Sequence, residues 1–164
     1  RFSSEAIFCH TKTTDDQEPK CDLSQMDLRE IDLSGMDMRG TNLRGTNLQD
    51  ANLTKVDLRE ANLIGSNLRR AYLIEANLSE ANLSEANLSG AILTKANLSR
   101  ANLKKVDFSS ELSLITHLNM ANLSEANLSS ANLLGVDFRS TILTNTFFCN
   151  TKMPDGKINN TSCD

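Results

Sequence analysis

Apolar positions recur at every fifth residue along most of this chain. Residues 21–110 divide into 18 consecutive pentads without an insertion, and the third residue of each is Leu, Met or Phe. The second residue is Asn or Asp in 16 of the 18, and the exceptions are Tyr72 and Ile92. The first residue is usually small or apolar. The same pattern resumes after residue 115 and continues to residue 150.

This five-residue period fits neither a helix nor a flat strand. Five residues of α-helix overshoot one turn by about 140°, which would scatter the leucines around the helix. In a strand, successive side chains face opposite sides, so an odd spacing sends neighbouring leucines to opposite faces. A chain that turns once per pentad brings the first and third residues inward each time. Four such sides close one coil of a solenoid, in which each residue stacks on the one about 20 positions away.

The repeated motif Ala-(Asn/Asp)-Leu-x-x, as in residues 76–80, resembles the pentapeptide-repeat family. The resemblance covers residues 21–110 and 116–150. It implies an all-β fold, a right-handed quadrilateral β-helix with four pentads per coil, although the period alone gives no handedness. At a strand spacing of about 4.8 Å, about six to seven coils form a rod of roughly 30 Å.

The pattern divides the chain into three parts. We expect a capping segment at residues 1–20, the solenoid at residues 21–150 and a disulfide-closed cap at residues 151–164, because exposed strand edges at the ends of a solenoid invite association. The pentad 111–115 places Ser113 where a leucine belongs, and the next pentad fits again in the same phase. We therefore expect residues 111–115 to form one irregular side of a coil.

Four cysteines lie in two pairs near the ends of the chain: Cys9 and Cys21, and Cys149 and Cys163. The Cα atoms of a disulfide lie within about 7 Å of each other, whereas the rod separates its two ends by roughly 30 Å. We therefore predict the local pairs Cys9–Cys21 and Cys149–Cys163; the alternative is four free thiols in a cytosolic protein. Disulfide-capped forms resemble exported cyanobacterial members of the family. That resemblance implies an extracytoplasmic location, the periplasm or thylakoid lumen, with the cytoplasm as the alternative.

Charge and motif content narrow the function classes. The formal net charge is −4, which disfavours binding of nucleic acid through a basic surface. No apolar run approaches the roughly 18 residues of a membrane-spanning helix. The histidines, His10 and His117, lie far apart, and no metal-binding spacing, phosphate loop or nucleophile motif is present. We expect a protein without catalytic residues, cofactors or metal.

Departures from the repeat gather on one side of the predicted coil. Counting in steps of 20 places six outward apolar residues together: Tyr72, Ile74, Ile92, Leu112, Leu114 and Leu134. A contiguous apolar surface often marks a site for a partner. The alternative is that residues 111–115 fold over Tyr72 and Ile92 and bury them. The same counting stacks charges alternately, as Lys55, Glu75 and Lys95, and as Glu85, Lys105 and Glu125.

Two functions are consistent with this pattern. The first is a non-enzymatic scaffold that binds a protein partner through the apolar side; neither the partner nor the oligomeric state is predicted. The second follows from the family resemblance, because some members mimic DNA with a strongly acidic rod and inhibit DNA gyrase, a topoisomerase. Arginines such as Arg29, Arg39 and Arg59 interrupt any such acidic field here.

Overall fold

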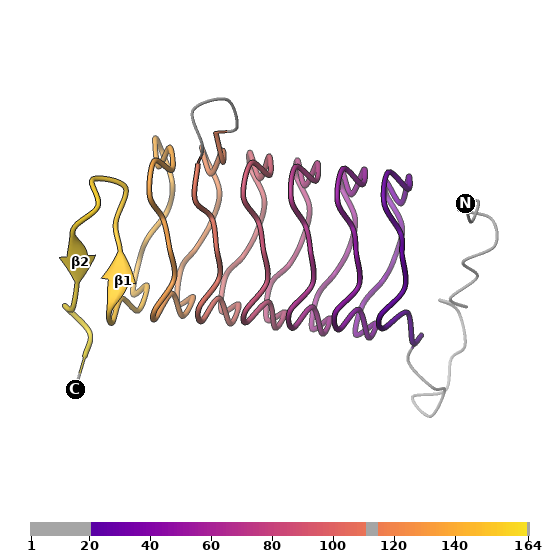
Figure 1. Cartoon of the computed structure of the whole chain (residues 1–164), viewed down its shortest axis with the longest axis horizontal. Helices are drawn as coiled ribbons and strands as arrows, with labels where there is room; N and C mark the ends of the chain where they lie inside the picture. Colours follow the sequence, from indigo (N-terminus) through magenta and orange to yellow (C-terminus); the bar gives the residue numbers. More distant parts are fainter. Residues whose placement is uncertain (1–20, 111–114, 164) are drawn as a thin grey trace.

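The computed structural model describes residues 21–110 and 115–163, which wind into a right-handed quadrilateral β-helix (Figure 1). Parallel bridges join each second-position residue to the one a coil further on, as from Asn42 to Asn62 and from Asn62 to Asn82. This 20-residue step confirms four pentads per coil. Two short strands, β1 (Thr151–Lys152) and β2 (Ile158–Asn159), pair antiparallel at the C-terminal end.

A tight turn at the end of each pentad produces the four corners, except at residues 106–110, which precede the break in the repeat. The third residue accepts a hydrogen bond from the first residue of the next pentad, as where Ala76 N donates to Leu73 O at 3.1 Å. The fifth residue then has a positive φ, 57° at Glu75, as the second central residue of a type II turn requires. Most fifth residues are not glycine, so other interactions must offset the cost of this backbone conformation.

Backbone hydrogen bonds stack the coils at three points on each side. The N–H of a third residue donates to a second-position carbonyl of the next coil, as from Leu43 to Asn62 at 2.7 Å. The fifth residue donates to a fourth-position carbonyl, and the second residue donates back to a first-position carbonyl of the previous coil. Every described side between two coils is therefore a fragment of parallel sheet.

The interior holds the first and third residues, as predicted. The third-position leucines from Leu33 to Leu133 are almost fully buried, and so are the first-position alanines. Because alanine is small, four leucines fit around the axis in each layer. Removing one such leucine side chain would cost about 2–5 kcal/mol.

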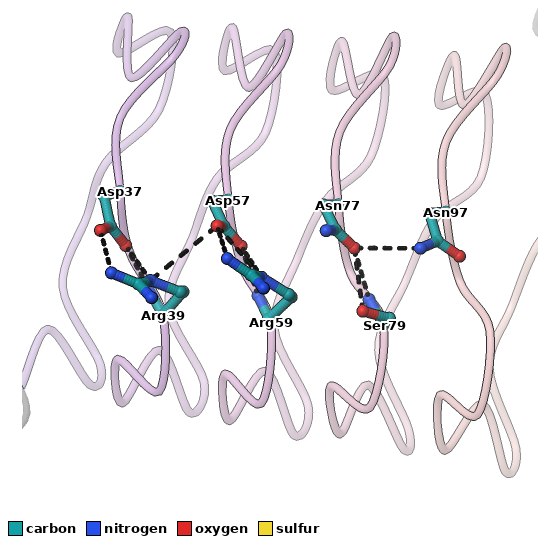
Figure 2. Close-up of polar contacts among 7 residues, drawn as sticks. All are labelled: Asp37, Arg39, Asp57, Arg59, Asn77, Ser79 and Asn97. Atoms are coloured by element: carbon teal, nitrogen blue, oxygen red, sulfur yellow. Dashed lines mark hydrogen bonds and ion pairs between the residues drawn. The ribbon is translucent and has the colours of Figure 1, made fainter.

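Second-position amides form a ladder along the outside of the rod. Asn77 Oδ1 accepts the backbone N–H of Ser79 at 3.2 Å, and Asn97 Nδ2 of the next coil donates to the same oxygen at 3.3 Å (Figure 2). In the first described coil all four second positions are Asp, and an Asp there needs only to accept: Asn42 Nδ2 donates to Asp22 Oδ1 at 3.0 Å. Because each amide donates toward the N-terminal coil, the first residue of a ladder has no described coil below it to donate to, and Asp is suited to that position.

The prediction of an irregular side at residues 111–115 is wrong. Bridges join Ile92 to His117 and Asp107 to Asn132, a step of 25 residues, so residues 116–120 form the side that residues 111–115 were expected to form. The extra pentad is an insertion between two sides, and residues 111–114 lie outside the described residues. The insertion closes where Thr116 N donates to Ser110 Oγ at 2.9 Å. Thr116 and Leu118 then occupy the inward first and third positions of this side, where Ser113 would have been too small to replace a leucine.

The C-terminal cysteines form the predicted bond. Cys149 and Cys163 are joined, with their Cα atoms 4.8 Å apart. Lys152 still bridges to Asn132 of the coil below, so the coil pairing extends two residues past the predicted boundary at residue 150. Cys21 is also disulfide-bonded. Its predicted partner Cys9, and the whole predicted capping segment 1–20, lie outside the described residues.

Candidate interaction surface

One side of the rod interrupts the amide ladder with apolar side chains. We call it the Tyr72 face, and in chain order its second-position residues are Asp32, Asn52, Tyr72, Ile92, His117 and Asp137. The ladder starts there, with Asn52 Nδ2 donating to Asp32 Oδ1 at 3.1 Å, and stops at Tyr72. Tyr72 is 46% exposed and Ile92 is half-buried, so an exposed aromatic ring and an aliphatic side chain follow Asn52 where amides would continue the ladder.

The structure brings together three of the six predicted patch residues. Tyr72 and Ile92 pair directly, and Ile74 lies in the same pentad as Tyr72. Leu134 does not join them, because its neighbour Asn132 pairs with Asp107 and thereby places Leu134 on the preceding side of the coil. The inserted pentad shifts every later residue by one side, and this shift is the physical reason for the error. Leu112 and Leu114 lie outside the described residues.

Counting through the insertion brings other residues onto the Tyr72 face. Met120 occupies its fifth position one coil above Lys95, whose N–H donates to Asn119 O at 3.1 Å, and Met120 is 55% exposed. Ile115, at the end of the insertion, is 50% exposed. A step of 25 residues across the break would have identified Met120 from the sequence. The alternative, that residues 111–115 bury Tyr72 and Ile92, depends on residues 111–114, which lie outside the described residues.

Alternating charges border the apolar residues. Glu75 lies between two lysines, 3.8 Å from Lys55 Nζ and 3.5 Å from Lys95 Nζ, as the stacking prediction required. Lys105 likewise meets Glu85 at 3.0 Å. Glu125, predicted above Lys105, instead contacts Arg100 at 3.0 Å because of the inserted pentad. These pairs are largely exposed, so each contributes little to stability, but together they leave no continuous acidic row.

Aspartates are further neutralised by arginines two residues on. Figure 2 shows Asp37 with Arg39 and Asp57 with Arg59, and Arg39 Nε also lies 3.9 Å from Asp57. At the last coil the Arg139 guanidinium, by hydrogen bonding to the carboxylate, lowers the pKa of Asp137 to about 2. In the same direction, Arg39 and Arg59 lower the pKa values of Asp37 and Asp57 by hydrogen bonding to their carboxylates.

The described residues offer no other site chemistry. Within residues 21–110 and 115–163, no group of three or more His, Cys, Asp and Glu residues is placed to hold a metal ion. In the same residues, no helix is long and apolar enough to cross a membrane. His117 lies between Ile92 and Asp137 in the second-position column. The surface is therefore characterised by its shape, its apolar interruption and its mixed charge.

Comparisons with known proteins agree with the repeat geometry. The sequence model described as "Pentapeptide repeats (8 copies)" matches residues 20–54, 51–90, 71–109 and 116–155. No curated protein matches this chain.

Three solved structures are similar. A pentapeptide repeat protein from the thylakoid lumen of Arabidopsis thaliana is 28% identical, with 71% of this chain and 70% of that chain covered and a TM-score of 0.47. HetL, a pentapeptide repeat protein involved in heterocyst differentiation regulation from the cyanobacterium Nostoc sp. strain PCC 7120, is 29% identical over 84% of this chain and 78% of its own, with a TM-score of 0.30. Trypsin-treated QnrB1, a plasmid-mediated fluoroquinolone resistance protein, is 23% identical over 77% and 79%, with a TM-score of 0.30.

The family match spans most of the chain, and its repeats coincide with the five-residue sides that the hydrogen bonds define. This chain belongs to the pentapeptide-repeat family.

Proposed function

We propose that this protein is a non-enzymatic scaffold that binds a protein partner through the Tyr72 face. The observation that supports this proposal is the exposed Tyr72 ring, 46% accessible in a column where Asn or Asp would continue the ladder. Aromatic residues are enriched in the buried centres of protein interfaces. Because the ring stands on a rigid rod, little backbone freedom is lost on binding.

The surroundings of the ring favour a protein partner over a nucleic acid. Ile74 and Ile92 extend the apolar area, and the row of Lys55, Glu75 and Lys95 borders it with charges of both signs. An apolar centre with a polar rim is the usual organisation of a protein interface. The alternation of charge along the rod gives no support to the DNA-mimic alternative, which requires a continuous acidic surface.

The test replaces the apolar residues with the residue that the repeat itself prefers. In the double variant Tyr72→Asn and Ile92→Asn, the new amides extend the ladder from Asn52, so the coil keeps its fold. We expect this variant to lose a partner that crosslinks to the wild-type protein in native extract. Phe147→Asn, an exposed aromatic second position on another side, serves as the matched control and should retain that partner. Equal recovery of the partner by the wild-type and the double variant would refute the proposed site.

We also infer an extracytoplasmic location, the periplasm or thylakoid lumen, and capping roles for residues 1–20 and 151–164. The Cys149–Cys163 bond supports both inferences, because disulfides persist in oxidising compartments and are rare in the cytosol. Thiol titration of the protein isolated from its source with an alkylating agent present tests the location. Four reactive thiols after unfolding would contradict it.

A further inference from the structure

The last coil carries an open strand edge on two of its four sides. Residues 136–145 form these sides, and we call them the open edge. Between lower coils, such groups bond to the next coil, but here they have no backbone partner among the described residues. The unpaired groups are the N–H groups of Phe138, Ser140, Leu143 and Asn145 and the carbonyls of Val136 and Thr141.

The C-terminal segment covers the other part of that coil. It turns back after β1 so that β2 pairs with it, as the two arrows at the yellow end of Figure 1 show. Ser162 N donates to Phe148 O at 2.9 Å, and Asn160 Oδ1 accepts from Asn150 N at 2.8 Å. None of these contacts reaches residues 136–145, so the described residues protect one part of the last coil's edge and leave another part unpaired.

Apolar groups accompany the unpaired backbone. Phe138 and Leu143 point inward but are only partly buried, whereas Leu118 and Leu123 one coil below are fully buried. On the outer surface Ile142 is 49% exposed. The bonds that hold the first open side to the coil below are also long, 3.3 Å from Leu118 N to Asp137 O. The inward apolar side chains are therefore incompletely buried at the place where the strand edge is unpaired.

Polar groups at the open edge indicate what should lie above it. Where an Asn stacks on an Asp that has no arginine two residues on, its amide donates to the carboxylate, as from Asn132 to Asp107 at 3.1 Å. Asp137 is a second-position carboxylate with no residue above it among the described ones. Because Arg139 already pairs with Asp137, as Arg59 pairs with Asp57 beneath Asn77, an amide side chain can lie above Asp137 without a bond to the carboxylate. Arg139 beside it is 83% exposed and calls for an acidic or polar neighbour.

A second copy stacked end to end fits this edge poorly. A full coil needs all four sides, and the C-terminal segment already stands beyond the other part of the last coil, where β2 pairs with β1 and Ser162 N donates to Phe148 O. The first coil of a second copy could therefore not stack on all four sides. An extended segment over residues 136–145 needs only the part that the C-terminal segment leaves open.

We propose that the open edge binds an extended segment of a partner protein, which adds a parallel strand to the last coil. Extended backbone is the chemistry that satisfies a row of unpaired N–H and C=O groups. The segment carries apolar side chains over Phe138 and Leu143 and an amide side chain over Asp137. This site lies outside the Tyr72 patch and does not depend on the function proposed for it.

A peptide copied from the chain itself is a suitable probe. Residues 51–60 stack in the intact rod on residues 31–40, which occupy the same two sides as the open edge. As a free fluorescein-labelled peptide they would place Asn52 over Asp137, Leu53 over Phe138 and Leu58 over Leu143. We expect the full-length protein to raise the fluorescence anisotropy of this peptide in a saturable manner.

N-methylation of the peptide provides the matched control. In the rod the N–H groups of Asn52 and Asp57 point to the coil below, and those of Leu53 and Leu58 point to the coil above. Methylating the first pair removes two hydrogen bonds to the open edge and should weaken binding at least about tenfold. Methylating the second pair should leave binding nearly unchanged.

Variants of the protein locate the site. Leu143→Arg should abolish binding, with circular dichroism confirming that the coils remain folded, and Tyr72→Asn should bind like the wild type. An absence of saturable binding, or equal loss with both methylated peptides, would overturn the proposal. Sedimentation equilibrium tests whether a second copy of the chain occupies the open edge instead. If the wild type were a dimer that Leu143→Arg dissociates, the open edge would belong to a second copy and the proposed partner segment would be overturned. A failure of the Tyr72→Asn and Ile92→Asn experiment would refute the Tyr72 face but would not change the expected binding of the peptide to the open edge.

Discussion

Two inward hydroxyl groups on one side of the rod should respond oppositely to the same substitution. Thr46 and Ser66 both occupy buried first positions, one coil apart. Thr46 Oγ1 donates to the carbonyl of Leu23 at 2.8 Å, whereas Ser66 Oγ has no partner. Most pentads place Ala at this position. Replacing each residue with Ala therefore removes a useful hydroxyl in one case and an unsatisfied one in the other.

The magnitudes follow from the groups removed. Thr46→Ala loses one hydrogen bond, about 1 kcal/mol, and one buried methyl group, about 1 kcal/mol, so the free energy of unfolding should fall by about 2 kcal/mol. The Leu23 carbonyl still accepts from Met26 N at 3.3 Å, which limits the loss. Ser66→Ala removes a buried polar atom without a partner and should raise stability by about 1 kcal/mol.

Thermal unfolding followed by circular dichroism measures both effects. For a chain of this size, 1 kcal/mol shifts Tm by about 2–4 °C. Thr46→Ala should therefore melt about 4–8 °C lower and Ser66→Ala about 2–4 °C higher. Thr46→Ser keeps the hydrogen-bond donor and should lie between Thr46→Ala and the wild type. If Ser66→Ala destabilised the protein as much as Thr46→Ala, the assignment of first-position hydroxyls to specific carbonyls would be refuted.

Two further predictions concern the corners and the last coil. Gly65 has a φ of 62°, and a Cβ added there would meet nothing within 4 Å. Gly65→Ala should therefore lower the free energy of unfolding by about 1 kcal/mol through backbone strain alone, and Gly65→Asn should cost less because Asn tolerates positive φ better. Urea unfolding measures both, and equal midpoints for the two variants and the wild type would contradict this prediction. Because the folded-state pKa of Asp137 is lowered to about 2 from an ordinary value of 3.8, its contribution to stability is present above pH 4 and is lost as the pH falls from about 4 to about 2. Asp137→Asn should remove this part of the acid dependence, which urea titrations at pH 5 and pH 2.5 measure, and an unchanged pH dependence would show that the Arg139 pair contributes nothing.

The period of the sequence was sufficient for the fold but not for the position of every side. Five-residue spacing with inward first and third residues defines the coil, and nothing else in the chain competes with it. An inserted pentad, however, has the same length as a side, so the phase of the repeat after residue 115 is identical in both cases. The clue was Ser113, which cannot fill a leucine column. Because the insertion was not predicted, Leu134 was assigned to the wrong side of the coil and Met120 was not assigned to the Tyr72 face.

Other features required the direction of the hydrogen bonds. The four second-position Asp residues of the first described coil are visible in the sequence, but their reason emerges only once Asn amides are known to donate toward the N-terminal coil. The open edge is equally hidden, because the pentads of residues 136–145 keep the repeat period although no described coil covers them. Sequence reasoning identified Tyr72 and Ile92 because they depart from the motif, and it missed Phe138 and Leu143 because they conform to it.

The stacking step of the coils is the claim on which the rest depends, and spin labels measure it directly. Ser79, Ser99 and Ser124 occupy the same outward position on three successive coils, with a step of 20 residues and then of 25, whereas Asn119 lies on the preceding side. Labels on engineered cysteines at Ser79 and Ser99, and at Ser99 and Ser124, should sit on adjacent strands about 4.8 Å apart and show strong dipolar broadening. A label pair at Ser99 and Asn119 should show much less. Strong broadening for Ser99 with Asn119 and weak broadening for Ser99 with Ser124 would contradict the inserted pentad, and weak broadening for Ser79 with Ser99 would contradict the four-sided coil itself.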